Sequence, residues 1–283
     1  MKTSVGFYLI SDQFLICACL SILAVVVICV YLFGTGIPAM ADVGFFKFLF
    51  GTEWRPDAES WGIFPMIIGS ILVTGIAILI GVPIGVLCAV FMSFYCPKKL
   101  YRFVKPAINL LAGIPSIVYG FFGVMVLVPF IRNVFGGSGK SLLTAGILLG
   151  IMILPTIIKT TEASLNAVPT SYYEGSLALG ATHERSVFFA ALPAAKSGIL
   201  AAIILGVGRA IGETMAVVMV AGNQAILPES ITSGVRTLTS NVILEMGYAD
   251  EHKQGILVAT AVVLFVFILI INLCFSVLKR RKD

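Results

Sequence analysis

Charged side chains are scarce in this sequence. Only 12% of the 283 residues are Asp, Glu, Lys or Arg, whereas 59% are hydrophobic and the mean hydropathy is +1.04. Soluble globular domains carry about 25% charged residues, so this chain has too few to cover a water-facing surface. We infer that lipid surrounds much of it. The net charge of +5 is then better explained by membrane topology than by nucleic-acid binding, for which the sequence has no motif.

Residues suited to metal binding or catalysis are also few. The six cysteines lie in or beside apolar segments without a C-x-x-C pair, and the two histidines, His183 and His252, are far apart. This pattern disfavours disulfide and zinc sites, and we expect no metal, no cofactor and no catalytic residue. The glycine-rich segment 136–141 is similar to a nucleotide-binding P-loop, but Val134 stands where that motif needs its first glycine. We therefore do not expect this chain to hydrolyse ATP.

Long apolar runs are abundant. A helix needs about 20 apolar residues to cross the hydrocarbon core of a bilayer. Runs of this length without polar–apolar alternation indicate helices rather than barrel strands. We therefore predict an all-α membrane protein with six transmembrane helices. They cover approximately residues 14–33, 63–94, 106–130, 141–158, 197–221 and 255–278.

The first apolar run has a second interpretation. Lys2 precedes it, and Ala39-Met40-Ala41 is similar to a signal-peptide cleavage site. Signal peptides have an apolar region of about 7–15 residues, and this run is longer. We therefore expect it to be retained as a membrane helix.

Basic residues are distributed unequally between alternate loops. If the amino terminus is cytoplasmic, 12 lysines and arginines fall on the cytoplasmic side, 6 fall outside, and Arg209 lies within a span, which accounts for all 19. The cytoplasmic set is Lys2, Lys98, Lys99, Arg102, Lys105, Lys159, Arg185, Lys196, Lys279, Arg280, Arg281 and Lys282. Basic residues favour the cytoplasmic side, so we predict that both termini are cytoplasmic.

Glycine is frequent within the predicted spans. Three G-x-x-x-G patterns occur there, at Gly81–Gly85, Gly146–Gly150 and Gly208–Gly212. Small residues at this spacing let helix backbones approach closely. They predict tight packing within this chain or against a second membrane subunit.

Arg209 and Glu213 are the charges near the middle of the fifth predicted span. A charge at the bilayer centre costs about 2.5–3.5 kcal/mol on insertion scales, so both side chains should face the bundle interior or a watery path. If the helix is continuous, the i,i+4 spacing puts them on one face, where they can pair. Either the pair is structural and locks helices together, or it lies on a pathway where the guanidinium binds a passing oxyanion. We favour the pathway.

The long loop between the fourth and fifth spans, 159–196, is cytoplasmic by the charge count. Pro169-Thr170-Ser171 predicts the start of a helix, and Gly180 predicts its end. Ala178, Leu179 and Ala181 would give this helix an apolar face, which needs a partner groove or a lipid surface.

This loop resembles the coupling motif of ABC importer permeases, which reads E-A-A, three residues, glycine, nine residues, then I-x-L-P. Glu174, Gly180, Leu192 and Pro193 match, whereas Gly175, Ser176 and Ala190 depart from it. Three further stretches are similar to the C-type permease of phosphate-specific transport (Pst) systems: G-I-P-S-I-V-Y-G-F-F-G at 113–123, I-L-P-T at 153–156 and G-R-A-I-G-E-T-M-A-V at 208–217. The resemblance covers about residues 61–272.

The resemblance implies a MetI-like fold in an inner-membrane importer. Residues 1–62 would hold the first helix and outer loop, 63–278 the permease core and 279–283 a basic cytoplasmic tail. Its partners would be an A-type permease, an ATPase dimer and a periplasmic or lipid-anchored phosphate-binding protein. The pathway residues would be Arg209, Glu213 and Thr214, and the ATPase-coupling residues Tyr173, Glu174, Leu177, Ala178, Gly180 and Ala181.

Other functions remain open from the residues alone. Arg209 does not itself select phosphate, so sulfate or molybdate is an alternative cargo. A self-sufficient secondary transporter or channel is a second alternative, although the sequence shows no obvious inverted repeat and the coupling loop would then be unexplained. A membrane scaffold is a third, and the cost of placing Arg209 in a span argues against it.

Overall fold

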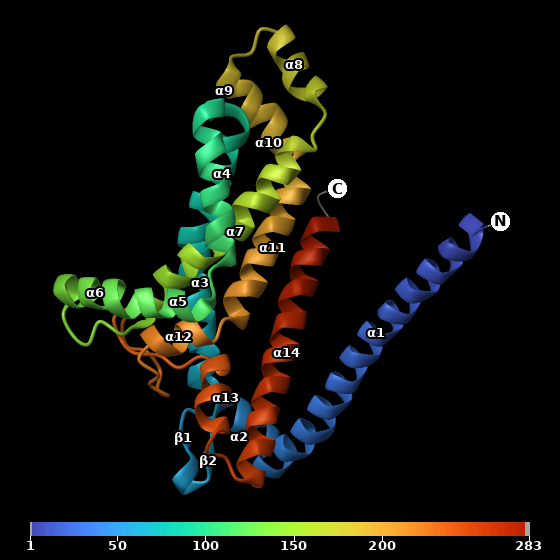
Figure 1. The fold of residues 1–283 in the computed structure, drawn as a ribbon. Coiled ribbons are helices and arrows are strands. Elements are labelled where there is room, and N and C mark those ends of the chain that lie inside the picture. The colour runs from blue at the N-terminus through green and yellow to red at the C-terminus, as the bar shows by residue number, and fades with distance from the viewer. Residues whose placement is uncertain (1, 281–283) are drawn as a thin grey trace.

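The computed structural model describes residues 2–280, and the side chains of residues 13–274 and 277. It is almost entirely helical, and α3, α7, α11 and α14 run along one axis while α1 diverges from them (Figure 1). The long helices are α1 (Lys2–Val43), α3 (Phe64–Val90), α4 (Lys98–Gly113), α7 (Leu142–Asn166), α11 (Lys196–Gly212) and α14 (Glu251–Arg280). The shorter elements are α2 (Phe45–Phe50), β1 (Trp54–Arg55), β2 (Ser60–Trp61), α5 (Ser116–Phe122), α6 (Val128–Phe135), α8 (Thr170–Ala178), α9 (His183–Ser186), α10 (Leu192–Ala194), α12 (Met215–Val220) and α13 (Leu238–Met246).

The six predicted spans all have counterparts. Five helical stretches of the described chain are long and apolar enough to cross a membrane: 13–43, 64–95, 116–135, 142–166 and 251–274. The sixth is a bent pair, His183–Ala194 with Lys196–Gly212, whose axes meet at 69°. The all-α membrane class is therefore confirmed, although two of the predicted helices are interrupted.

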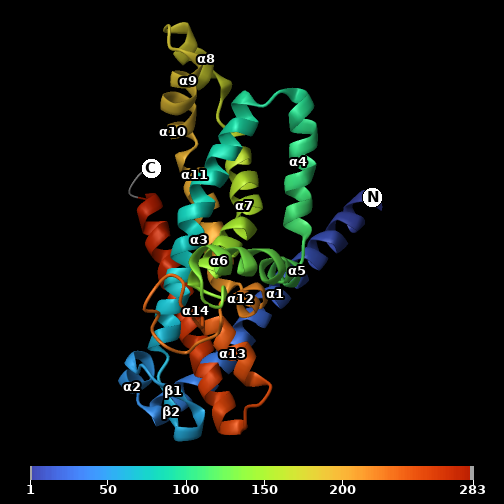
Figure 2. The same ribbon diagram turned by 90° about the vertical axis from the view of Figure 1, so that its left-hand side faces the viewer.

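The two ends of the bundle differ in content (Figures 1 and 2). One end carries α8 to α10 and the turn between α3 and α4, and the other carries α2, the β1–β2 hairpin and α13. The start of α1 and the end of α14 both lie toward the end with α8. The predicted basic tail, 279–283, and Lys2 lie outside the described side chains.

The β1–β2 hairpin lies at the end of the bundle opposite α8 (Figure 1). Trp54 on β1 pairs with Trp61 on β2, and their rings meet edge to face with centroids 5.4 Å apart. Both rings are buried in an apolar cluster with Met40 of α1 and Ile256 of α14. Helix α1 continues through residues 39–41, and Met40 of that segment is buried.

Helices α3 and α7 pack on each other along their length, and glycine lets them approach closely. A Cβ on Gly81 would lie 2.8 Å from the Ile153 side chain, and one on Gly85 would lie 2.8 Å from that of Ile157. Real Cβ atoms do not approach so closely. Two of the three G-x-x-x-G patterns thus serve packing within this chain, as one of our two interpretations predicted.

Substitution of Gly146 tests this packing. A Cβ there would lie 2.5 Å from the Ile76 side chain of α3, so Gly146→Ala should cost about 1–3 kcal/mol through overpacking. We expect a lower melting temperature and less folded protein in detergent. Gly75→Ala is the matched control, because no described atom lies within 4 Å of its added Cβ. Equal stability of the two variants would contradict a glycine-dependent α3–α7 contact.

The continuous helix predicted for 106–130 is wrong. Helix α4 ends at Gly113, Ile114 is extended with φ −70° and ψ 126°, and α5 begins after Pro115. Proline restricts the preceding residue to extended backbone, which explains the break. Helices α5 and α6 then lie across the bundle axis in both views (Figures 1 and 2).

The continuous helix predicted for 197–221 is also wrong. Helix α11 ends at Gly212, and Glu213 is extended with φ −69° and ψ 132°. The chain resumes as α12 at Met215. The candidate site lies at this second break.

Candidate functional site

The α11–α12 break exposes backbone groups that a helix would satisfy internally. Thr239 of α13 donates its hydroxyl to the Glu213 carbonyl at 3.0 Å, and the Ala216 N–H donates to the Glu213 carboxylate at 3.3 Å. Non-helical backbone at membrane depth is tolerated where protein buries it or where it lines a cavity. Helix breaks of this kind form the substrate and ion sites of many transporters.

Arg209 lies on the last turn of α11. Its Nη1 donates to the Thr156 hydroxyl on α7 at 3.3 Å, and Thr156 directly follows Pro155 in the I-L-P-T stretch. The side chain is half-buried, and it forms no ion pair with any residue the structure describes. Arg209 therefore remains a cation whose charge no carboxylate of the described chain neutralises.

The predicted pairing of Arg209 with Glu213 is wrong. The i,i+4 argument assumed a continuous helix, and the extended backbone at Glu213 rotates its side chain off the α11 face. Glu213 instead lines a small pocket with three hydroxyl residues, Ser70 and Thr74 of α3 and Thr237 before α13. The third predicted pathway residue, Thr214, is half-buried and turns its hydroxyl to the Gly212 carbonyl at 3.3 Å.

The G-I-P-S-I-V-Y-G stretch, residues 113–120, forms the α4–α5 break and packs against α12. The Tyr119 hydroxyl donates to the Leu111 carbonyl at 2.8 Å, across the α4–α5 break. A Cβ on Gly120 would lie 3.0 Å from Ala216 Cα of α12, so glycine lets α5 and α12 cross closely. The two short helices that follow the two breaks therefore pack on each other.

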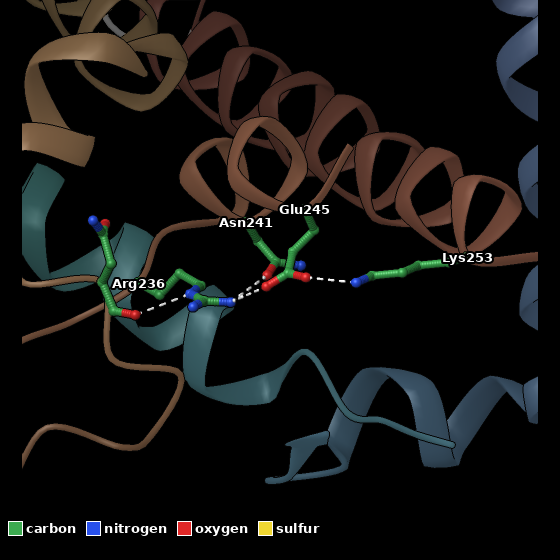
Figure 3. A network of polar contacts seen from close by, with 5 residues as sticks. Arg236, Asn241, Glu245 and Lys253 are labelled. Atoms are coloured by element: carbon green, nitrogen blue, oxygen red, sulfur yellow. Dashed lines mark hydrogen bonds and ion pairs between the residues drawn. The ribbon is translucent and has the colours of Figure 1, made fainter. Parts of the chain in front are cut away.

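Arg236 is a site residue that our reading of the sequence missed. Its Nη1 donates to Asn241 Oδ1 at 3.1 Å and pairs with Glu245 Oε1 at 2.9 Å, while its Nε donates to the Asn223 carbonyl at 3.0 Å. Lys253 of α14 reaches Glu245 from the other side at 2.7 Å (Figure 3). In the sequence, Arg236 is one of the six cations predicted to lie outside, and no local pattern links it to α13 and α14.

Helix α13 connects the Arg236–Glu245–Lys253 network to the α11–α12 break. Its amino-terminal cap, Thr237, receives the Ser240 N–H, and its first N–H, at Leu238, donates to Ser70 of α3 at 3.0 Å. The first turn of α13 contains Thr239, which donates to the Glu213 carbonyl. The last turn contains Glu245. Helix α13 therefore contacts both the backbone of the break and the Arg236–Lys253 network.

The Glu245 network predicts a pH-dependent stability. Burial raises the pKa of Glu245, but the hydrogen bonds and charges of Lys253 and Arg236 outweigh it and hold this pKa below its ordinary 4.5. The interactions of the Glu245 carboxylate with Arg236 and Lys253 therefore stabilise the fold above pH 4.5. This contribution is lost as the pH falls through the lowered pKa of Glu245. Glu245→Gln should cost about 1–2 kcal/mol at neutral pH.

Melting curves in detergent would measure this cost. We expect Glu245→Gln to melt below wild type at neutral pH and to converge with it as the pH falls through the lowered pKa of Glu245. Glu251→Gln, at an exposed carboxylate of the same region, serves as the control. A deficit that stays constant over the whole pH range would contradict the assigned role of the carboxylate charge.

The predicted coupling helix forms at the end of the bundle opposite α13. It is α8, and Gly180, with φ +85°, ends it in the left-handed conformation that glycine adopts readily. Glu174, Leu177, Ala178 and Gly180 are exposed, whereas Tyr173 and Ala181 are half-buried. Nearby apolar side chains also face outward, with Leu179 92% and Phe189 78% exposed.

An apolar cavity lies away from the breaks. It has a volume of about 490 Å³ between α1 and α14 and is lined by apolar side chains that include Phe33, Ile37, Val262 and Val266. It offers no polar group to an anion, so we do not assign it to transport.

Comparison with known proteins agrees with this geometry. The family described as "Binding-protein-dependent transport system inner membrane component" matches residues 81–283. The probable ABC transporter permease protein YqgH of Bacillus subtilis is 39% identical over 277 residues, covering 94% of this chain and 89% of that protein. The phosphate transport system permease protein PstC of Mesorhizobium japonicum is 33% identical over 277 residues, covering 90% and 84%.

Solved structures add the fold. A chain of the inward-facing MetNI methionine ABC transporter superposes with a TM-score of 0.65 at 22% identity, covering 82% of this chain and 100% of that one. The predicted MetI-like fold is thereby confirmed. The chain is thus a multi-pass inner-membrane permease subunit, not itself an enzyme, and it belongs to the binding-protein-dependent transport system inner membrane component family.

Proposed function

We propose that this permease imports phosphate and that Arg209 is the group that phosphate meets in the pathway. The main support is the position of Arg209, which lies at a helix break inside the bundle and has no carboxylate partner in the described chain. A guanidinium offers planar, bidentate hydrogen bonds to an oxyanion. The several relatives named PstC, at 32–35% identity, support phosphate as the cargo.

Glu213 has a different role in this proposal from the one its sequence spacing suggested. It does not neutralise Arg209; it stabilises the start of α12 through the Ala216 N–H. Its charge nearby weakens anion binding, and a conduction site must release what it binds. Thr156 supplies a hydroxyl to the Arg209 guanidinium, and Thr214 adds a further hydroxyl at the helix break.

Membership of the family implies an ATPase and a binding protein as partners. We assign the ATPase dimer to the exposed α8 surface, which makes that end, and with it both termini, cytoplasmic. The phosphate-binding protein then docks at the end with α2 and α13. An A-type permease closes the pathway along α11, where no described atom lies within 4 Å of a Cβ placed on Gly208 or Gly212.

The mechanism we propose is alternating access. ATP binding closes the ATPase dimer, α8 carries this motion into the bundle, and the pathway opens outward to receive phosphate. Hydrolysis resets it inward. This chain contributes the geometry and the cation, and the partner contributes the chemical energy.

Reconstitution of the copurified complex in vesicles tests the proposal. We expect ATP-dependent phosphate uptake that requires the binding protein. Sulfate and molybdate should not be taken up in place of phosphate. Preferential uptake of one of those anions would replace phosphate as the cargo. Uptake by the purified chain without ATPase would favour a secondary transporter or channel and refute the proposal.

A further inference from the structure

Tyr173 does not share the outward orientation of its neighbours on α8. Its hydroxyl lies 2.6 Å from Nδ1 of His183, the first residue of α9, and the two groups share a hydrogen bond. Ser186 donates to Ser176 at 3.0 Å one turn further along. Helices α8 and α9 are thus fastened to each other by side chains ten residues apart.

The same two rings also contact the end of α3. That helix finishes in a π-helical turn, Phe91–Tyr95, and such turns insert an extra residue that re-aims side chains. The Tyr95 ring meets His183 edge to face with centroids 4.7 Å apart, and the Phe94 ring lies 5.9 Å from that of Tyr173. Four aromatic rings from three helices therefore form one joint, which we call the aromatic joint.

The covalent connections of α8 to the bundle are poor candidates for passing on a motion. The chain turns between α7 and α8 at residues 167–169, and it bends by 69° at Ala195 between α10 and α11. Neither connection continues as a straight helix. Val187 and Leu192, which follow α9, pack in an apolar cluster with residues of α3 and α7. The aromatic joint ties α8 itself into that packing, because Tyr173 contacts both His183 and Phe94.

Helix α3, by contrast, is packed tightly along the route to Arg209. Ile157 of α7 lies against Gly85 of α3 and also against Gly206 of α11, since a Cβ placed on either glycine would lie 2.8 or 3.0 Å, respectively, from the Ile157 side chain. Thr156, the partner of Arg209, is the residue next to Ile157. Contiguous packing of this kind transmits displacement between sites.

We propose that Tyr173 and His183 are positioning residues that clamp α8 to the end of α3, and that the aromatic joint transmits the ATPase motion into the bundle. This inference rests on the proposed docking of α8 on the ATPase. It adds the route within this chain, which begins at the π-helical turn of α3 and ends at the α7–α11 contact beside Arg209.

The test compares Tyr173→Phe and Tyr95→Leu in the reconstituted complex. The first removes the hydrogen bond and keeps the ring, and the second removes the ring that faces His183. The measured quantity is the number of phosphate ions imported per ATP hydrolysed. We expect it to fall roughly 3- to 10-fold in each, as for the loss of one hydrogen bond or ring contact, with copurification of the ATPase retained. Tyr31→Phe, at an exposed ring on α1, is the control.

The outcomes separate the two proposals. Wild-type vesicles that hydrolyse ATP but import no phosphate refute the proposed function. Wild-type import with an unchanged ratio in both variants overturns the aromatic joint and leaves the proposed function intact. Loss of the ATPase from either purified variant would show a purely structural role and would also overturn the joint. Partial recovery in His183→Gln relative to His183→Ala would support a hydrogen-bonded clamp.

Discussion

Arg209→Glu is expected to abolish ATP-dependent phosphate uptake while the complex still assembles. Two unit charges about 4 Å apart at an effective dielectric constant of 20 interact by about 4 kcal/mol, so replacing attraction by repulsion should lower the uptake rate by at least about 100-fold. The fold should tolerate the change, because the side chain is only half-buried and makes a single hydrogen bond, to Thr156. Uptake of labelled phosphate into vesicles measures the effect.

Two variants refine this prediction. Arg209→Lys keeps the charge but loses the planar fork, so it should retain partial uptake. Thr156→Val removes the hydroxyl that holds the guanidinium and should have a smaller effect than the charge reversal. Normal uptake by Arg209→Glu, with the complex intact, would rule out Arg209 as a pathway residue.

Glu174→Lys is expected to uncouple ATP hydrolysis from transport. The carboxylate is exposed on α8, so its replacement should leave this chain folded and act at the ATPase surface. We expect stimulation of ATP hydrolysis by the loaded binding protein to fall about 10-fold, the equivalent of one or two lost charge-assisted hydrogen bonds. Steady-state ATP hydrolysis with and without the binding protein is the measurement.

Glu184→Lys provides the matched control, since Glu184 is an exposed acid on α9 in the same region. A selective effect of Glu174→Lys indicates a specific contact, whereas equal effects would indicate a general response to surface charge. Wild-type stimulation in Glu174→Lys would contradict docking through this face of α8. This test addresses the partner surface and is independent of the aromatic joint within the chain.

The membrane class and the approximate spans could be predicted from the sequence because hydropathy is a local property. Twenty apolar residues in succession must be helical in lipid whatever their neighbours are. Glycine spacing likewise predicted close packing at Gly81–Gly85 and Gly146–Gly150. It could not tell which helix is the partner, and the structure shows that Gly208 and Gly212 face open space instead.

The candidate site was only partly predictable. An arginine in an apolar run is conspicuous from its cost alone, so Arg209 was found. Its relation to Glu213 was not, because helical periodicity was extended across a residue whose backbone is in fact extended. The Pro115 break was likewise visible only as a proline within an apolar run.

Arg236 and the Tyr173–His183 pair lay beyond sequence reasoning for another reason. Their contacts join α13 to α14 and α8 to α3, so no spacing along one helix announces them. Arg236 was conspicuous only as one of six outer cations, and Tyr173 only as a neighbour of Glu174.

The sequence by itself determined that this chain is a bundle of membrane helices with an arginine inside an apolar segment, because the cost of placing a residue in lipid depends on that residue alone. Only the tertiary structure decided which groups meet. Three features depend on contacts between segments far apart in the chain: the break at Glu213, the hydrogen bond from Thr239 of α13 to the Glu213 carbonyl, and the aromatic joint between α8 and α3. Those contacts contribute free energy only after the helices have packed, so local sequence does not reveal them.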